Sequence, residues 1–257
     1  MKYIITEQQY KRVNEITIFD GVMRVSPTYK DVLDIVIGDI GEKTYYKSVK
    51  QYVKKVLGYQ KKFKKRDVKD YGRAVQYDNT DEMSEELKKP EVLSNMAYLM
   101  AKKFLKVKML GDLECYVKSF SSDKQYFFFD PELEMCVGSV YLNKRFEDNY
   151  LDAISLPEES YSVSLSKIDN DIKGMGYGKL IYLAVLSDVD VLMSDKSLYT
   201  DSLNIWVNVL PRYALTGAVM NDGKLKIIKP STPVLKHEDV SRYFATKKLN
   251  LIKLKNG

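Results

Sequence analysis

The sequence contains little cysteine and histidine and no long hydrophobic run. Its two cysteines, Cys115 and Cys136, lie in apolar strand-like segments, so we expect reduced core thiols and no disulfide framework. The single histidine, His237, excludes a site built on several histidines, and without a zinc signature we predict no metal site. No apolar run reaches membrane-spanning length, and residues 1–7 become charged too soon for a signal peptide. We therefore expect a cytoplasmic protein.

The composition is that of a soluble globular protein. Hydrophobic residues make up 45% of the 257 positions and charged residues 30%, which is enough apolar material for a sizeable core. The net charge is only +6, from 41 basic and 35 acidic residues. A strong excess of charge can therefore only be local.

The strongest local excess lies between Lys43 and Arg66, a segment with nine lysines, one arginine and no acidic residue. Apolar residues recur there at helical spacing and predict a basic amphipathic helix: Tyr45, Val49, Tyr52, Val53, Val56 and Phe63. Such a face can contact a nucleic-acid backbone, a protein partner or an anionic membrane, although most faces of this kind are simply solvated. A nucleic acid and a protein are the candidate partners of this segment.

Two further helices are predicted from their start signals. Ser26 and Pro27 have the N-cap and first-turn preferences that begin a helix, and Gly38 and Gly41 are placed to end it. With the basic segment, this helix predicts a helical N-terminal extension over residues 1–80. Pro90 begins the other helix, whose methionines are expected to fill the core of a second domain over residues 81–257.

From residue 113 onward the pattern changes to alternating apolar residues. Four strands separated by polar turns indicate an antiparallel meander: 113–120, 126–130, 135–142 and 161–168. Later signals predict, in order, a strand at 189–193, a helix at 199–210 and a hairpin of 215–219 with 225–228. The lysine-rich end, residues 247–257, is expected to be a loose tail or an edge strand.

One stretch, residues 161–187, combines a strand, a glycine turn and a helix. Gly174, Gly176 and Gly178 stand directly before an apolar helical run. Glycines let the backbone approach a ligand, and a helix N-terminus offers unpaired N–H groups with partial positive charge, so this turn is a candidate anion site. The spacing G-x-G-x-G departs from the dinucleotide fingerprint, and Leu180 stands where a P-loop needs a hydroxyl. A glycine turn without a ligand and a site for another nucleotide are the remaining alternatives.

The run from Lys173 to Gly178 resembles the acetyl-CoA motif of the GCN5-related N-acetyltransferases, Q/R-x-x-G-x-G/A. Lys173 replaces the usual Gln or Arg, so positive charge is kept while the planar guanidinium is lost. The resemblance implies an α/β (α+β) fold with a mixed, mostly antiparallel sheet flanked by helices, a bulge at Gly138, and the hairpin as the last two strands. It also implies that acetyl-CoA is the cofactor, with the turn amides around Met175 and Tyr177 on its pyrophosphate. The residues implied to bind it are Ser166, Lys167, Ile168, Lys173, Gly174, Met175, Gly176, Tyr177, Gly178 and Lys179.

The catalytic half of the family pattern is less complete. Family members place a tyrosine as proton donor in the helix after the fifth strand, in the pattern A-x-x-x-Y, which here gives Ser202 and Trp206. Because an indole cannot supply the proton, Tyr199 and Tyr213 become the candidate catalytic residues. Glutamates 158 and 159 could deprotonate an amine through water.

Two functions follow from these patterns. The resemblance implies an acetyl-CoA-dependent N-acyltransferase that acts on an amine. The alternative is a catalytically degenerate protein of the same fold, used for binding or assembly on a phage particle or a nucleic acid through Lys43–Arg66. The opening of the chain is similar to that of phage-encoded proteins, which implies the host cytoplasm or a virion as its location.

Overall fold

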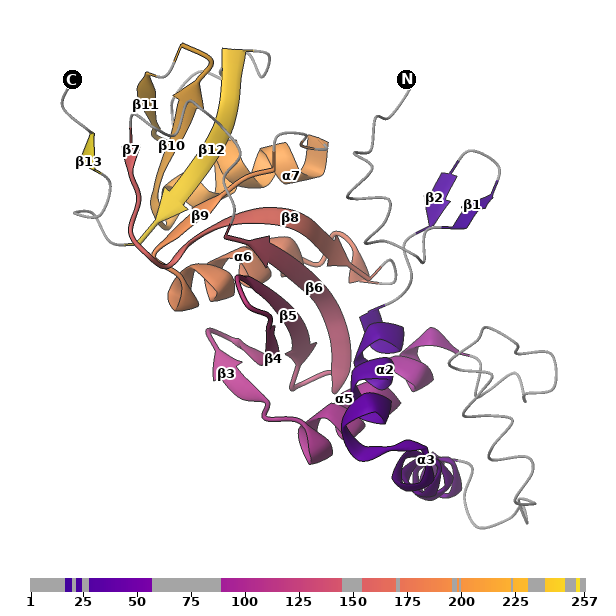
Figure 1. The fold of residues 1–257 in the computed structure, drawn as a ribbon. Coiled ribbons are helices and arrows are strands. Elements are labelled where there is room, and N and C mark those ends of the chain that lie inside the picture. The colour runs from indigo at the N-terminus through magenta and orange to yellow at the C-terminus, as the bar shows by residue number, and fades with distance from the viewer. Residues whose placement is uncertain are drawn as a thin grey trace. The chain divides into compact units, whose positions relative to one another are not determined.

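The computed structural model divides the chain into two compact units. It describes residues 17–19, 22–24, 28–56, 89–144, 154–169, 172–195, 198, 200–222, 224–230, 239–247 and 253–254. Unit 1 comprises Met1–Val107, Phe129–Val137 and Asp169–Asp171, and unit 2 comprises Lys108–Phe128, Gly138–Ile168 and Ile172–Gly257. Figure 1 labels the elements. The predicted domain boundary at residue 80 falls outside the described residues and stays a prediction.

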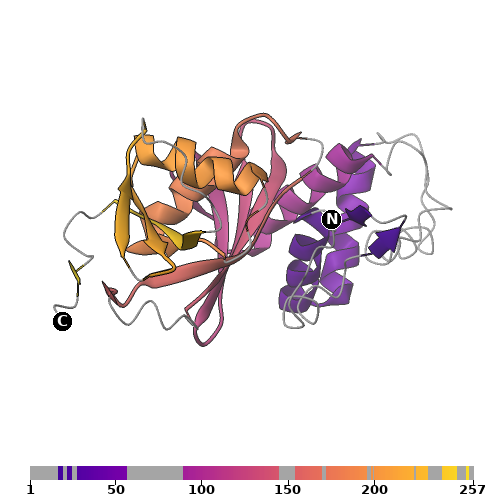
Figure 2. The same cartoon turned by 90° about the horizontal axis from the view of Figure 1, so that it is seen from above.

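The described part of unit 1 contains three helices that pack against one another: α2 (Thr28–Ile40), α3 (Glu42–Val56) and α5 (Pro90–Phe104) (Figure 2). The helices predicted from Ser26–Pro27 and from Pro90 are therefore confirmed. α2 runs through Gly38 and ends before Gly41, whose φ of 73° is the left-handed conformation that ends a helix. A short antiparallel hairpin of β1 (Thr17–Phe19) and β2 (Val22–Arg24) precedes α2 and was not predicted.

α3 buries one face and exposes lysines on the other. Four residues of the predicted apolar face are buried: Tyr45, Val49, Tyr52 and Val53. The exposed side includes Lys43, Lys47 and Lys55. The Tyr52 hydroxyl donates a hydrogen bond to Asn95 Oδ1 at 2.8 Å and so fixes α3 on α5. The predicted basic helix is thus confirmed as far as Val56, and residues 57–66 lie outside the described part of the chain.

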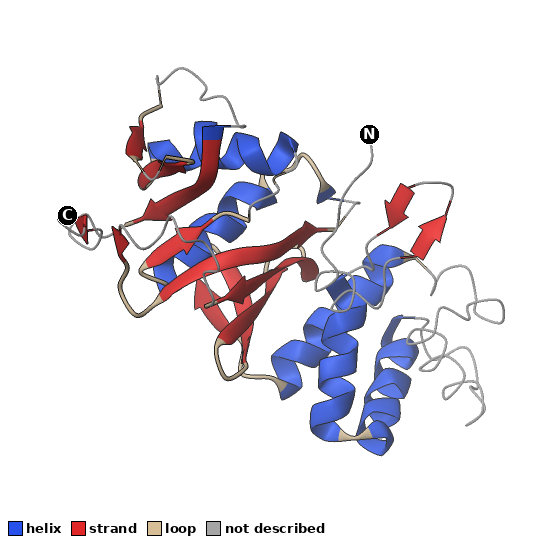
Figure 3. Ribbon diagram, turned by 45° about the horizontal axis from the view of Figure 1, so that its top comes forward, coloured by secondary structure: helices blue, strands red, loops and turns tan. Residues whose placement is uncertain are grey.

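A nine-stranded sheet runs in the order β11-β10-β12-β9-β8-β6-β5-β4-β3 (Figure 1). Figure 3 colours the strands red and the helices blue. Its strands are β3 (Lys108–Leu110), β4 (Leu113–Ser119), β5 (Asp123–Asp130), β6 (Met135–Asn143), β8 (Ser160–Ile168), β9 (Val191–Met193), β10 (Leu215–Met220), β11 (Leu225–Ile228) and β12 (Val240–Thr246). The architecture is mixed α/β with a mostly antiparallel sheet. β4, β5, β6 and β8 lie side by side, as the predicted meander requires.

The parallel neighbours β8 and β9 are joined by α6 (Tyr177–Asp188), which packs on β3, β4 and β9. The apolar run after the glycines is therefore the predicted helix. β8 pairs with β9 only where Ser160–Ser162 lie opposite Val191–Met193. The rest of β8 continues beyond the end of this short ladder.

A bulge interrupts the antiparallel pairing of β6 with β8. Leu142 lies opposite Val163 and Tyr141 opposite Leu165, so Ser164 is the extra residue. The bulge is therefore not at Gly138 of β6, as expected, but on β8, opposite Tyr141 and Leu142. A side chain at Gly138 would meet the carbonyl oxygen of Lys167 on β8, so this glycine serves close strand packing.

The C-terminal part of unit 2 differs from the prediction in two places. The helix expected at 199–210 is a single α-helical turn, α7 (Thr200–Asn204), followed by a π-helical turn, η3 (Ile205–Val209), and a 3-10 turn, η4 (Leu210–Arg212). The predicted hairpin of β10 with β11 is confirmed. It does not complete the sheet, because the unpredicted β12 lies between β9 and β10. β7 (Ile154–Ser155) pairs with β13 (Lys253–Leu254) near the end of the chain.

The cysteines and the helices bear on two predictions made from composition. Cys115 and Cys136 are both buried free thiols, as expected. Among the described residues, no helix is long and apolar enough to cross a membrane.

Candidate functional site

The glycine turn between β8 and α6 has the backbone geometry that only glycine adopts readily. Gly174 has φ 84°, and Gly176, the residue before the first helical residue of α6, has φ 89°. A Cβ built on either residue would meet no atom within 4 Å. The turn therefore leaves open space beside its backbone at two positions.

Three backbone donors of this turn are unused within the described structure. The N–H groups of Gly174, Gly176 and Gly178 have no acceptor among the described residues, whereas the Met175 N–H donates to Ile172 O at 3.3 Å. The Lys179 N–H donates to Gly176 O at 3.1 Å. Within the described part of the chain, the donors without an acceptor are thus those of the glycines, whereas the N–H of Met175, which the family resemblance implied as a ligand donor, is already used. They stand at the N-terminus of a twelve-residue helix, where an anion is favoured.

Gly178 allows close packing in addition to carrying one of these N–H donors. A Cβ at this position would lie 3.0 Å from Ile205 Cδ1 and 3.2 Å from Ile168 Cδ1. The side chain of Ile168 therefore packs under the first turn of α6, and Tyr177 beside it is buried. The end of β8, the start of α6 and η3 meet at this glycine.

Two predicted site residues with different expected roles lie together. Lys179 Nζ lies 4.6 Å from the centre of the Tyr213 ring, and Tyr213 is 48% exposed. The Lys179 ammonium lowers the pKa of Tyr213 below its ordinary value. Lys173 is exposed at the start of the turn, and Tyr199 lies outside the described residues. Tyr213, a predicted catalytic residue, thus lies beside Lys179, a residue of the glycine turn segment that was predicted to bind the cofactor.

The end of β8 carries a hydroxyl pair that was not predicted. Ser166 Oγ lies 3.1 Å from the hydroxyl oxygen of Tyr182 on α6. Tyr182 is buried and meets Trp206 edge-on, with ring centres 5.6 Å apart at 86°. Burial raises the pKa of Tyr182. The available signal was helical spacing, because Tyr182 follows Gly178 by four residues and so faces the same strand.

Trp206 is fully buried, which agrees with its being unable to act as a proton donor. Its indole N–H has no hydrogen-bond partner within the described structure. A buried donor without a partner is costly and rare in native proteins. Trp206 also lies in a π-helical turn, an irregularity that is frequent at functional sites.

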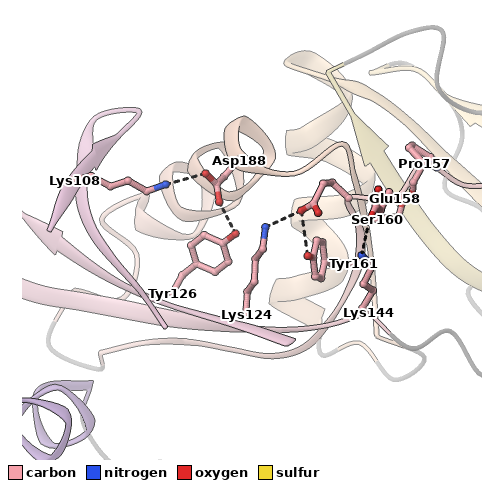
Figure 4. A network of polar contacts seen from close by, with 10 residues as sticks. Lys108, Lys124, Tyr126, Lys144, Pro157, Glu158, Ser160, Tyr161 and Asp188 are labelled. Carbon is pink, nitrogen blue, oxygen red and sulfur yellow. Dashed lines mark hydrogen bonds and ion pairs between the residues drawn. The ribbon is translucent and has the colours of Figure 1, made fainter. Parts of the chain in front are cut away.

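The two glutamates considered as bases belong to a polar network at the start of β8 (Figure 4). Lys124 Nζ lies 2.8 Å from Glu159 Oε2, and the Tyr161 hydroxyl donates to the same oxygen at 3.1 Å. The hydrogen bond from Lys124 lowers the pKa of Glu159, so this carboxylate is a weak base. Glu158 forms a long ion pair with Lys144 at 4.0 Å.

The same network continues to the C-terminal end of α6 (Figure 4). Asp188 accepts hydrogen bonds from Lys108 Nζ at 2.9 Å and from the Tyr126 hydroxyl at 2.8 Å. The polar groups of this network are paired with one another. This arrangement is expected of a structural network, which here holds α6 against β3 and β5. Among the described residues, no group of three or more acidic, cysteine or histidine side chains is placed to hold a metal ion.

Comparison with known proteins adds no identification. No family model matches the sequence, and no curated protein matches it. The function is therefore argued from the geometry of the glycine turn and its neighbours.

Proposed function

We propose that this chain is an acetyl-CoA-dependent N-acyltransferase with a fold of the GCN5-related type. The observation that carries the proposal is the glycine turn between β8 and α6. Three of its N–H groups have no acceptor among the described residues, and two of these three glycines, Gly174 and Gly176, lie beside open space. A pyrophosphate needs several converging donors and a close backbone approach, and a helix N-terminus adds a favourable partial charge. The bound ligand would supply an acetyl thioester for transfer to an amine.

The turn fits the phosphates of this ligand. Gly174, Gly176 and Gly178 would donate their N–H groups to the phosphate oxygens, and Lys173 would add positive charge at the exposed start of the turn. Lys179 would contribute from the first helical turn. Because Tyr213 lies beside Lys179, we assign it to this end of the site and not to proton donation.

The edge of β8 fits an extended arm with amide groups. β9 pairs only with Ser160–Ser162, so the segment of β8 from Val163 to Ile168 extends past the end of its ladder with β9. An extended ligand can add to such an edge through main-chain hydrogen bonds, as a strand does. The bulge at Ser164 lies within this segment.

The test is a thermal-shift assay with acetyl-CoA. At a concentration of about 100 times the Kd, a ligand stabilises the native state by about 2.7 kcal/mol. For a chain of this size this corresponds to a rise in Tm of about 5–10 °C. We expect Gly176→Val to abolish the rise, because a β-branched residue strains the left-handed conformation and fills the open space.

The matched control is Gly217→Ala in β10, where a Cβ would collide with the Phe244 ring. This variant should lower the Tm of the free protein and keep the response to acetyl-CoA. No response of the unmodified chain would reject the proposal. If the response is present, mass spectrometry of a lysate treated with the protein and acetyl-CoA identifies the acetylated acceptor.

The second candidate function is binding of a nucleic acid or a phage-particle component through α3, and a specific observation favours it. Lys43, Lys47 and Lys55 of α3 are exposed. Tyr45 and Tyr52 are buried, so contacts would be electrostatic and independent of sequence. Fluorescence anisotropy with labelled RNA should show affinity that falls with salt. Lys43→Gln with Lys47→Gln should reduce the slope of log affinity against log salt by about two. A slope that these changes leave unaltered argues against α3 as the contact surface.

A further inference from the structure

An open groove of about 310 Å³ lies between α3 and α5, the two helices labelled in Figure 1. The described residues that line it all belong to unit 1. Residues three and four positions apart share one face of a helix, and the α5 side of the groove follows this spacing with Met96, Leu99, Met100 and Lys103. The groove is therefore bounded by one face of each helix.

The floor of the groove is apolar. Met96 and Met100 are buried in it, whereas Leu99 and Phe104 are half-exposed. Methionine is flexible and adapts to the shape of whatever packs against it, which is why such side chains recur at binding surfaces. The half-exposed Leu99 and Phe104 offer apolar surface that a partner can cover.

The rim of the groove is basic. Lys55 and Lys103 line it and are exposed, and Lys103 Nζ lies 5.0 Å from the centre of the Phe104 ring. Among the described residues, no carboxylate forms an ion pair with either lysine. The Glu134 carboxylate lies 3.5 Å from the Asn95 side chain and does not line the groove.

The charge of the two helices has the same sign as the rim. α3 contains five lysines and one glutamate, and α5 contains two lysines and one glutamate. A ligand that is apolar on one side and anionic on its flanks is therefore complementary to the groove.

This chemistry favours a helical peptide over a small molecule or a nucleic acid. Sites for small molecules enclose most of the ligand, whereas this groove is open. Single-stranded nucleic acids stack their bases on aromatic rings, and here Lys103 already lies over the ring of Phe104. An amphipathic helix lays apolar anchors at i, i+3, i+4 and i+7 into a groove of this kind.

We propose that the groove between α3 and α5 binds an acidic amphipathic helix of a partner protein. The apolar side chains of that helix pack on Leu99 and Phe104, and its carboxylates pair with Lys55 and Lys103. The inference does not depend on the proposed acyl transfer. It also differs from nucleic-acid binding through Lys43 and Lys47, because neither of these lysines lines the groove.

The test is fluorescence anisotropy with a labelled model peptide of about 18 residues, a length at which an isolated helix can form. The peptide carries Leu at i, i+3, i+4 and i+7, Glu on the flanks of this stripe and Ala elsewhere. Three further probes are a peptide with Lys in place of Glu, a scrambled acidic peptide without the stripe, and a single-stranded RNA. We expect the acidic amphipathic peptide to bind at least about tenfold more tightly than either other peptide.

Two variants test the rim and the floor separately. Lys55→Glu with Lys103→Glu should weaken binding of the acidic peptide by about tenfold or more and should strengthen binding of the basic peptide. Leu99→Gln should weaken the acidic peptide by about tenfold, because a half-exposed apolar contact is lost. Circular dichroism shows whether this variant keeps its helices.

The matched control for the rim is Lys43→Glu with Lys226→Glu. Both lysines are exposed and lie outside the groove, so the net charge changes equally. At physiological salt, charges more than about 8 Å away are largely screened, and this variant should keep its affinity for the acidic peptide. An equal loss in the control would assign the effect to overall charge and overturn the inference.

The remaining outcomes are also decisive. Absence of binding by the acidic amphipathic peptide, or equal binding of all three peptides, overturns the inference. RNA binding that is tighter than peptide binding, lost in the rim variant and retained in Leu99→Gln, assigns the lysines to a nucleic acid and overturns it as well. Exchange of peptide preference in the rim variant supports it even if Leu99→Gln does not fold.

Discussion

The close approach of β6 to β8 at Gly138 makes a quantitative prediction. A Cβ at this position would collide with the carbonyl oxygen of Lys167, lie 2.9 Å from Ile181 Cδ1 and lie 3.3 Å from Ile168 Cα. Two of these three atoms belong to the backbone of the neighbouring strand and cannot rotate away. We therefore expect Gly138→Ala to cost about 2–3 kcal/mol, the upper part of the range for overpacking.

Urea denaturation measures this loss of unfolding free energy in unit 2, which contains Gly138. Trp206 is the only tryptophan and lies in unit 2, so its fluorescence follows the unfolding of the unit that contains Gly138. A loss of 2–3 kcal/mol corresponds to a fall in Tm of about 5–10 °C for a chain of this size. Retention of the original denaturation midpoint would refute the close approach.

The matched control is Gly38→Ala in α2. A Cβ there meets no atom within 4 Å, and the residue lies inside a helix. Alanine is favoured over glycine in a helix by about 0.5–1 kcal/mol, so this variant should be slightly more stable when followed by circular dichroism. If Gly138→Ala lowers the unfolding free energy and Gly38→Ala raises it, then the surroundings of each glycine, and not alanine itself, determine the effect.

Three further substitutions test other contacts. Tyr126→Phe removes the hydrogen bond to the Asp188 carboxylate (2.8 Å) and should lower the unfolding free energy by about 1.5–3 kcal/mol in urea denaturation, whereas an unchanged midpoint would contradict this. Burial raises the pKa of Asp188, but hydrogen bonds from Lys108 and Tyr126 outweigh burial and hold that pKa below its ordinary value. The carboxylate therefore stabilises the fold above the ordinary pKa of about 3.9, and this contribution is lost as the pH falls through the lowered pKa. Asp188→Asn should make the loss of stability in acid shallower, and identical pH profiles would count against the assignment. Asp169→Ala removes the acceptor of the Thr28 N–H and hydroxyl (2.9 and 2.7 Å) at the start of α2 and should cost about 0.5–2 kcal/mol, with partial recovery in Asp169→Asn.

Local signals predicted the elements whose formation depends on neighbouring residues. Ser26–Pro27 and Pro90 marked the starts of α2 and α5, because proline fits the first turn of a helix. Alternation predicted β4, β5, β6 and β8, and the Asn221-Asp222-Gly223 turn predicted the hairpin of β10 with β11. In each case the determining residues lie within a few positions of the element.

The elements that were not predicted from the sequence form because of long-range packing. β12 carries Arg242, a buried cation that interrupts the apolar pattern of a strand. Its guanidinium donates to Ser162 Oγ at 2.9 Å and to Ser194 O at 2.7 Å, partners 80 and 48 residues away in the chain. Burial of such a group depends on acceptors that only the folded sheet brings together. No local pattern could have placed β12 between β9 and β10.

In the candidate site, too, local signals predicted some features, whereas others depend on long-range packing. Spacing alone located the glycine turn, and its open backbone geometry at Gly174 and Gly176 is present as expected. Helical spacing puts Tyr182 on the face of α6 that carries Gly178, but the pairing of Tyr182 with Ser166 also depends on the distance between β8 and α6, which spacing does not give. Lys179 and Tyr213 likewise meet only after η4 turns the chain back toward α6.

The two free cysteines fall one in each compact unit, with Cys136 in unit 1 and Cys115 in unit 2. Burial raises the pKa of the Cys115 thiol to about 12, and the Cys136 N–H donates to Ser94 Oγ inside a buried contact. Neither sulfur can react with an alkylating reagent until its surroundings open. Timed alkylation followed by peptide mapping would therefore report the opening free energy of each unit separately, within one unmodified chain.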